Sequence, residues 1–175
     1  MMSTDITLAY LRKTRQLFLG MIRELSVEQL NQIPEGFNNN IIWNLGHIAA
    51  STLGLCYIRS QVKPDMVLPF AGRFGKGTRP EGAVTAEEIS QIKELIAESL
   101  DQIEADIKAG VFEKLIPSST DTYQIPMDSI ENTLNCCLAH ENLHLGIAKA
   151  QKAVIVHANA RRQENEQEGT KISLN

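Results

Sequence analysis

The stretch that decides the fold is residues 41–60, IIWNLGHIAASTLGLCYIRS, which follows three asparagines at positions 38–40. Asparagine is a favoured N-cap residue, so a helix is predicted to begin directly after it. Apolar residues occur on nearly every face of this helix, whereas a surface helix carries a single apolar stripe. Such a helix has neighbours on several sides, which predicts an all-α helix bundle.

Three further segments have the 3.6-residue periodicity of amphipathic helices, and no segment alternates like a strand for long. They lie at residues 4–25, 85–110 and 128–158. Thr85 and Glu88 have capping-box spacing at the start of one of them, and Asp128 is the expected N-cap of the last. Together with residues 41–60 they predict four long helices.

Two connections are unusually long for a compact domain. Residues 62–84 contain three prolines and four glycines, and residues 111–127 also contain proline. Connections of this length are typical of crossovers or of loops that cover a site. We therefore predict a four-helix bundle with long crossover connections, as a single domain over residues 1–158. Residues 159–175 are polar, with no apolar face to bury, and are expected to form a C-terminal tail.

Composition excludes several classes of function. Lysine and arginine total 17 of the 175 residues against 21 acidic residues, a net charge of −4. The chain therefore lacks the basic surface that nucleic-acid binding requires. No apolar run approaches the roughly 20 residues of a bilayer span, and the N-terminal residues have no apolar core of a secretory signal. We expect a cytoplasmic protein with three reduced cysteines, and neither nucleic acid nor membrane as a partner.

The four histidines carry most of the functional information. His140 and His144 are spaced i, i+4, so they differ by about 40° in azimuth and one helical turn in height. His47 lies midway along the 41–60 helix, and if the two helices pack together the three imidazoles converge on one point. Three neutral imidazoles with open positions are a known catalytic arrangement for zinc, and would also hold nickel, iron or manganese. His157 falls on a different face and is expected to lie outside this group.

Alternative interpretations of the same residues stay open. The string HENLH at residues 140–144 matches the H-E-x-x-H pattern of zinc peptidases. The metzincin continuation requires Gly at position 147 and His at position 150, where this chain has Ile147 and Ala150. Histidines in an apolar core also form hydrogen bonds without a metal, so a purely structural role is the competing interpretation. Glu141, at the edge of the predicted site, is a candidate general base, with a supporting or structural role as its alternative.

Two weaker candidates lie nearby. Cys137 is one turn before His140 on roughly the same face, so its thiol could point towards the site. The alternative is a small buried hydrophobic residue, which is the usual role of free cysteine. The long connection at residues 62–84 carries basic side chains that could attract an anionic substrate, and an ordinary solvated loop is the plainer interpretation. These basic residues are Lys63, Arg73, Lys76 and Arg79.

Three strings taken together resemble the DinB/YfiT-like superfamily. They are WNLGHI at residues 43–48, HENLHLG at 140–146 and SVEQLNQIP at 26–34. The resemblance covers about residues 5–155 and implies a four-helix bundle of up-down-down-up connectivity, with a divalent metal held at one end by three histidines. It assigns His47, His140 and His144 as the ligands and leans towards a homodimer. Many relatives have Gln after the glycine of the second string, where this chain has Ile147.

Characterised members of the family that this chain resembles include thiol transferases and an isomerase of maleylpyruvate type. The resemblance therefore implies a metal-dependent enzyme, a thiol S-transferase or a hydrolase, that acts on a small electrophilic substrate, with a low-molecular-weight thiol as a possible partner. The metal would lower the pKa of a bound thiol or water. Trp43 and Asn44, on the turn before His47, are expected to line the pocket. The alternative is a metal-binding or small-ligand-binding bundle without turnover, with a role in stress response.

Overall fold

The chain is helical, as the periodicity predicts. The computed structural model describes the backbone of residues 3–172 and the side chains of residues 3–162. Within that range the structure contains no strand, and one isolated bridge joins Ser118 to Met127. The all-α prediction is therefore confirmed. The helices are α1 (Thr4–Ile22), α2 (Val27–Asn31), α3 (Ile41–Leu53), its π-helical continuation η1 (Gly54–Arg59), α4 (Ala71–Phe74), α5 (Ala86–Lys108) and α6 (Ile130–Ile172).

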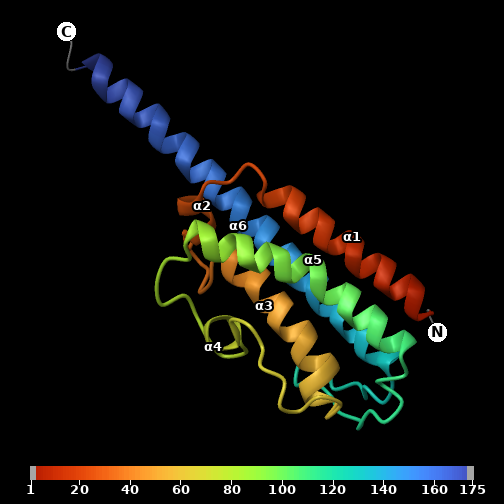
Figure 1. The fold of residues 1–175 in the computed structure, drawn as a ribbon. Helices are drawn as coiled ribbons and strands as arrows, with labels where there is room; N and C mark the ends of the chain where they lie inside the picture. Colours follow the sequence, from red (N-terminus) through yellow and green to blue (C-terminus); the bar gives the residue numbers. More distant parts are fainter. Residues whose placement is uncertain (1–2, 173–175) are drawn as a thin grey trace.

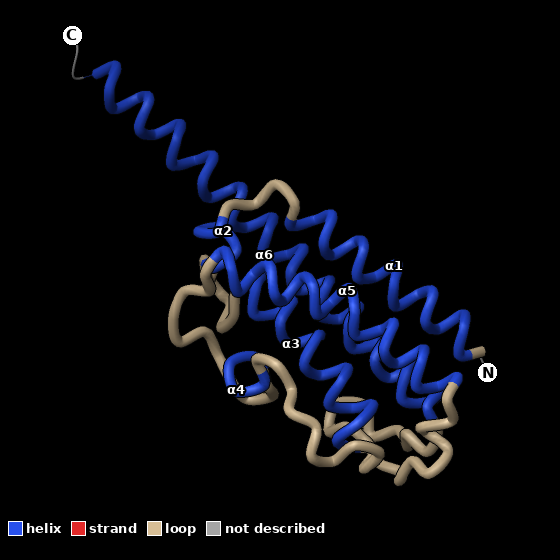
Figure 2. Tube along the Cα trace, viewed as in Figure 1, coloured by secondary structure: helices blue, strands red, loops and turns tan. Residues whose placement is uncertain are grey.

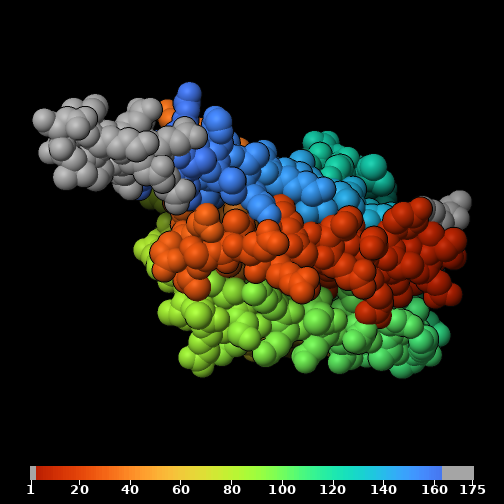
Figure 3. Space-filling view, turned by 90° about the horizontal axis from the view of Figure 1, so that it is seen from above, coloured from red at the N-terminus to blue at the C-terminus, as the bar shows by residue number. Residues whose placement is uncertain are grey.

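Four long helices, α1, α3, α5 and α6, lie side by side in the described part of the chain (Figure 1). α1 packs against α5 and α6, and α3 packs against the same two helices. The space-filling view shows α1 lying between α5 and α6 on one face of the molecule (Figure 3). α1 and α6 run towards one end of the assembly, whereas α3 and α5 run towards the other (Figure 1).

The two long connections have different paths (Figure 2). One leaves η1 at the lower end of the view, passes through α4 and returns to the upper end, where α5 begins. It must run along the molecule because α3 and α5 point in the same direction. The other joins α5 to α6 at the lower end. Residues of both connections line the cavity described below, together with residues of α3 and α6.

The N-cap residue of α3 is the predicted one, whereas the N-cap residue of α6 is not. The side-chain oxygen of Asn40 accepts a hydrogen bond from the backbone N–H of Trp43 at 2.9 Å, as the asparagine cluster predicts. At α6 the hydroxyl of Ser129 caps the helix, accepting from the backbone N–H of Asn132 at 3.2 Å. Asp128, the predicted cap, instead accepts from the side-chain amide of Asn132.

α6 continues beyond its predicted end. The apolar pattern stops near Ala158, yet the backbone stays helical to Ile172 and projects past the bundle (Figure 1). Residues 159–168 contain neither Gly nor Pro and consist mainly of Arg, Gln and Glu, which are good helix formers. Helix propensity therefore extends the helix where no core is available. Residues 173–175 of the predicted tail lie outside the described residues, and the division into domain and tail stays a prediction.

The apolar segment Ile41–Arg59 is long enough and hydrophobic enough to span a membrane, but 78% of it is buried inside the protein. α3 alone contributes twelve buried residues out of thirteen. Burial among α5, α6 and the long connection accounts for this hydrophobicity, as the apolar residues on all its faces predict.

A buried polar layer divides the hydrophobic core into two clusters. One cluster gathers around Phe18 and Ile48, and the other around Leu11 and Leu134. On each long helix at least one buried polar residue lies between the members of the two clusters, and four of them are bonded to one another. These residues are Arg15 on α1, Thr52 on α3, Ser99 on α5 and Glu141 on α6.

The centre of this layer is an ion pair between Arg15 and Glu141, whose side chains are 3% and 0% exposed. Arg15 Nη2 donates to Glu141 Oε1 at 2.7 Å, and its Nη1 donates to Ser99 Oγ at 2.7 Å and to the Ile96 carbonyl at 2.8 Å. The Thr52 hydroxyl donates to Glu141 Oε1 at 2.8 Å. Buried charges are tolerated when they are paired and hydrogen-bonded, and here one pair joins all four long helices.

Replacing Arg15 by Met should lower the free energy of unfolding by about 3–5 kcal/mol, because it leaves the Glu141 carboxylate buried without its partner. Equilibrium unfolding in urea at pH 7 measures this loss. Arg12→Met is the matched control on the same helix, since Arg12 pairs with Asp101 and Glu104 at the surface and its loss should cost much less. Equal losses for the two variants would contradict the assignment.

Candidate metal centre

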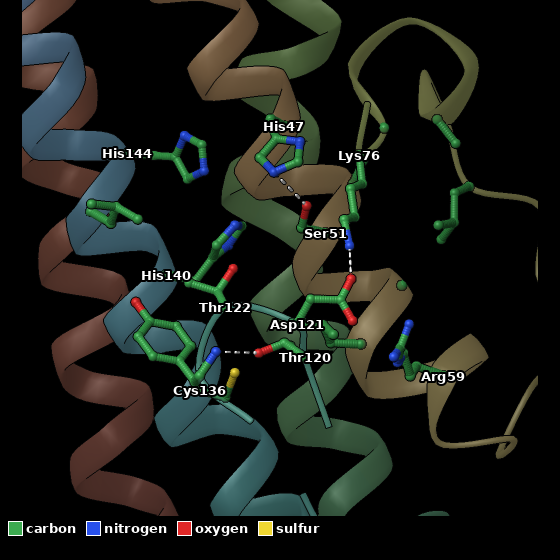
Figure 4. Close-up of a pocket in the computed structure, with 18 residues that line it drawn as sticks. His47, Ser51, Arg59, Lys76, Thr120, Asp121, Thr122, Cys136, His140 and His144 are labelled. Carbon is green, nitrogen blue, oxygen red and sulfur yellow. Dashed lines mark hydrogen bonds and ion pairs between the residues drawn. The ribbon is translucent and has the colours of Figure 1, made fainter. Parts of the chain in front are cut away.

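Three histidines from two helices meet at the wall of a cavity (Figure 4). The ring centroids of His47 and His144 are 4.6 Å apart, those of His140 and His144 are also 4.6 Å apart, and those of His47 and His140 are 5.2 Å apart. One ring nitrogen from each residue lies within 4.8 Å of the other two. The structure thus brings together the three residues predicted from the sequence, as a group that could hold a metal ion.

α4 and Trp43 fix the position of His47. Its Nδ1–H donates to the backbone carbonyl of Phe74 at 2.7 Å, which leaves Nε2 unprotonated. The Ser51 hydroxyl lies 3.2 Å from that Nε2. The indole of Trp43 stacks on the imidazole, with centroids 4.6 Å apart and planes 10° apart. The ring is therefore held on one edge and one face.

Gly46 makes this arrangement possible. A Cβ at position 46 would lie 2.5–2.9 Å from three atoms of the Phe74 ring, closer than real contacts allow. The absence of a side chain lets α4 approach α3 closely enough for the Phe74 carbonyl to reach His47. The glycine directly before the histidine is thus a requirement of the site.

A buried amide chain holds His144. Its Nδ1–H donates to Asn44 Oδ1 at 2.7 Å, and Asn44 Nδ2 in turn donates to the Asn40 carbonyl and to Gln151 Oε1 at 2.9 and 3.0 Å. Gln151 Nε2 donates to the Asn39 carbonyl at 2.6 Å. These bonds orient the Asn44 amide with its oxygen towards the ring. Nε2 of His144 is therefore also unprotonated.

His140 has an unsatisfied nitrogen. Its Nδ1 is buried and has no hydrogen-bond partner in the structure. Buried polar atoms are normally paired, so an orphaned one calls for an explanation such as an ion. The residues present fit a divalent metal, because His47 and His144 each have an unprotonated nitrogen in a ring that an acceptor anchors through its other nitrogen, and His140 has a nitrogen without a partner.

Burial keeps all three imidazoles neutral. Desolvation, together with a smaller effect of the neighbouring imidazoles, lowers the pKa of His140 to about 4 and that of His144 to about 3. Desolvation also lowers the pKa of His47, against a smaller opposing effect of its bond to Phe74. Neutral imidazole is the form that binds a metal, so the three histidines can bind one at pH 7 without first losing a proton.

A cavity of about 400 Å³ opens beside the imidazoles. One part of its wall is apolar and includes Leu55, Leu68 and Leu143. Charged side chains from η1 and from both long connections form another part. These are Arg59, Lys76 and Asp121. The volume suits a small organic molecule with one end at the imidazoles.

Trp43 and Asn44 contact the imidazoles and not the cavity. Trp43 is 5% exposed and its Nε1–H donates to the Thr78 hydroxyl at 3.0 Å. Asn44 is 1% exposed and faces His144. Neither lines the cavity. The structure therefore places both residues behind the histidines, where they fix ring orientation.

Glu141 faces the core. Both of its oxygens accept hydrogen bonds from Arg15, one of them also accepts from Thr52, and the residue does not line the cavity. Its placement favours the structural alternative to a general base. The catalytic role stays a prediction that the proposal below does not use.

The cysteine in the cavity wall is Cys136 and not Cys137. Cys137 is fully buried against Cys56 in the core. Cys136, His140 and His144 are spaced i, i+4, i+8, and this stripe on one helix face is the signal that could have found it. Burial raises the pKa of the Cys136 thiol, with a further rise from Cys137, so the thiol stays protonated at neutral pH.

The metal-free protein should lose stability as the pH falls from 6.5 to 5. The pKa values of His140 and His144 lie below the ordinary 6.5, so the unfolded chain takes up protons first, and stability present above pH 6.5 is lost towards pH 4. The expected loss at pH 5 is on the order of 2 kcal/mol for each ring. Urea unfolding of chelator-treated protein at pH 7 and pH 5 measures it. Carboxylates titrate mostly below this window, and equal stability at both pH values would refute the burial argument.

Comparison with known proteins agrees with this geometry. A search of curated proteins finds no match to the chain. A family model described as the DinB superfamily matches residues 10–148, which contain all three histidines and most of the bundle. The match covers well over half of the sequence. The chain therefore belongs to the DinB superfamily.

Proposed function

We propose that this protein is a metal-dependent enzyme that transfers a small thiol to an electrophilic substrate, with metal-dependent hydrolysis as the alternative reaction. The observation that carries the proposal is the group of three neutral imidazoles at the wall of a cavity of about 400 Å³. A buried group used only for packing would not need an unsatisfied nitrogen beside a cavity. Perturbed titratable groups beside a cavity are typical of functional sites.

His47, His140 and His144 would hold the metal, and zinc is the ion that three neutral imidazoles favour, with nickel, iron and manganese as alternatives. When bound, such a metal supplies Lewis acidity that lowers the pKa of a thiol or a water. The Phe74 carbonyl and the Asn44 amide keep two of the rings in the orientation required for ligation.

The chain's own residues would position the reactants. Leu55 and Leu68 form an apolar part of the cavity wall, against which the uncharged part of a small molecule can pack. The Ser51 hydroxyl, 3.2 Å from His47 Nε2, can donate a hydrogen bond to an anionic sulfur or oxygen at the imidazoles. Cys136 lies in the same wall as a neutral thiol, so we assign it no nucleophilic role.

We further infer the up-down-down-up four-helix connectivity of the family, which the directions of α1, α3, α5 and α6 support. A cytoplasmic homodimer is part of the same proposal. Ile6, Tyr10 and Leu17 on α1 are each about half exposed and could supply part of a dimer interface. Sedimentation of the purified protein as a monomer would remove the dimer from the proposal.

Protein purified without a histidine tag should retain close to one equivalent of divalent metal, measured by elemental analysis. Trp43 is the only tryptophan and stacks on His47, so binding of Co²⁺ or Ni²⁺ should quench its fluorescence. His144→Ala should weaken binding by at least about 100-fold, because it removes one ligand.

The matched control is His157→Ala, which removes an exposed histidine on the same helix. It should leave metal content and quenching unchanged. Equal metal retention by His144→Ala and His157→Ala would reject the metal site and support a structural role of the three imidazoles as hydrogen-bonding groups in the core.

Metal-loaded protein should conjugate thiols to chlorodinitrobenzene faster than chelator-treated protein does. His144→Ala should lose at least about 100-fold in kcat/KM, because the reacting group would no longer be activated. Product formation is followed by absorbance with several thiols, and a nitrophenyl ester is assayed in parallel for hydrolysis. Turnover of the ester alone would select the hydrolase, and metal binding without any turnover would select the non-catalytic bundle.

A further inference from the structure

One part of the cavity wall is charged. Its charged side chains are Arg59 from η1, Lys76 from the connection between α4 and α5, and Asp121 from the connection between α5 and α6. Two cations and one carboxylate give this part a net charge of about +1, whereas the whole chain carries −4. The local charge is therefore opposite in sign to that of the protein.

A carboxylate already occupies the space between the two cations. Lys76 Nζ forms an ion pair and hydrogen bond with Asp121 Oδ2. The hydrogen bond from Lys76 lowers the pKa of Asp121, and the charges of Lys76 and then Arg59 lower it further. Figure 4 shows this pair at one side of the cavity, between the imidazoles and Arg59.

The Lys76–Asp121 pair is weak enough to exchange. Its side chains are 77% and 74% exposed, and exposed ion pairs contribute little because water competes for both charges. Arg59 donates from Nη2 to the Ser119 carbonyl at 2.7 Å, and a guanidinium has further N–H donors available. A second carboxylate can therefore replace Asp121 at little cost.

We propose that Arg59 and Lys76 form a subsite for the carboxylate of a small substrate, and that Asp121 is an internal carboxylate which the substrate displaces. The substrate class is a molecule with a carboxylate at one end and a thiol or electrophilic group at the other. This inference rests on the proposed function, because the second end of the molecule lies at the imidazoles.

The helix geometry gives an upper bound on the length of such a molecule. His47 and Arg59 are twelve residues apart on α3 and η1, a rise on the order of 18 Å along the helix axis. The Arg59 side chain lines the same cavity as the imidazoles, so the gap between the two ends is shorter than this rise. A cationic substrate would meet two like charges, with Asp121 already paired.

The test compares acids with their methyl esters on metal-loaded protein. The probes are 3-mercaptopropionate, 6-mercaptohexanoate and 8-mercaptooctanoate, each paired with its ester, with affinity measured by calorimetry. At least one acid should bind about 5- to 20-fold more tightly than its ester, as expected for two partly exposed ion pairs. Arg59→Gln and Lys76→Gln should each reduce that ratio about two- to fivefold.

Asp121→Asn should act in the opposite direction. It should tighten binding of the acid about two- to fivefold and leave the ester unchanged, because Lys76 no longer has an internal partner. Lys93→Gln, at an exposed lysine on α5 outside the cavity, removes the same charge and should not alter the ratio.

The absence of any acid preference, or a preference that survives in both Arg59→Gln and Lys76→Gln, would overturn the subsite. Weaker binding of the acid by Asp121→Asn would overturn the role of the internal carboxylate. Selective acid binding without conjugation would support the subsite and reject the proposed enzyme. Conjugation at equal rates with acids and esters would support the enzyme and reject the subsite.

Discussion

The buried ion pair between Arg15 and Glu141 sets the level at which the four long helices meet. Glu141 is adjacent to His140 in the sequence, and its oxygen accepts from Thr52, five residues after His47. The contact that closes the polar layer therefore also sets the register of α3 against α6 beside the imidazoles. A slide of α6 would leave Glu141 buried without Arg15, which is far more costly than a small loss of apolar packing. A slide of α3 would break the hydrogen bond from Thr52 to the same carboxylate. The alignment of the three imidazoles therefore depends on an ion pair in the core that does not belong to the histidine group.

Neutral acceptors orient the imidazoles. His47 donates to the Phe74 carbonyl and His144 to the Asn44 amide, and no carboxylate among the described side chains is hydrogen-bonded to the three rings. A divalent cation held there would keep its full charge, because neither the ligands nor their supports neutralise it. Such a centre favours anionic partners such as thiolate, hydroxide or carboxylate. In the proposal above, the cations Arg59 and Lys76 would act in the same direction, so the metal and the charged part of the wall would both select for negative charge.

The two long connections build much of the site. The first carries Phe74, which anchors His47, and Lys76, which lines the cavity. The second carries Asp121, which also lines the cavity and pairs with Lys76. The helices therefore supply the imidazoles, while the connections supply charged side chains in the cavity wall beside them. Loops of this kind vary more freely than core helices, so membership of the DinB superfamily indicates the metal group more strongly than it indicates the reaction.

The sequence by itself determined the helical class, the positions of the long helices and the three histidines, because periodicity, capping residues and i, i+4 spacing are local properties. It could not place Glu141, whose neighbours suggest a catalytic role until its partner Arg15, 126 residues away, is seen. The i, i+4, i+8 spacing of Cys136, His140 and His144 could have indicated Cys136 in place of Cys137, but no spacing could show that Trp43 and Asn44 support the rings from behind. Those facts depend on how the helices rotate and where the irregular connections run. Only packing between distant segments decides these, because no local pattern encodes which buried side chain will meet which partner.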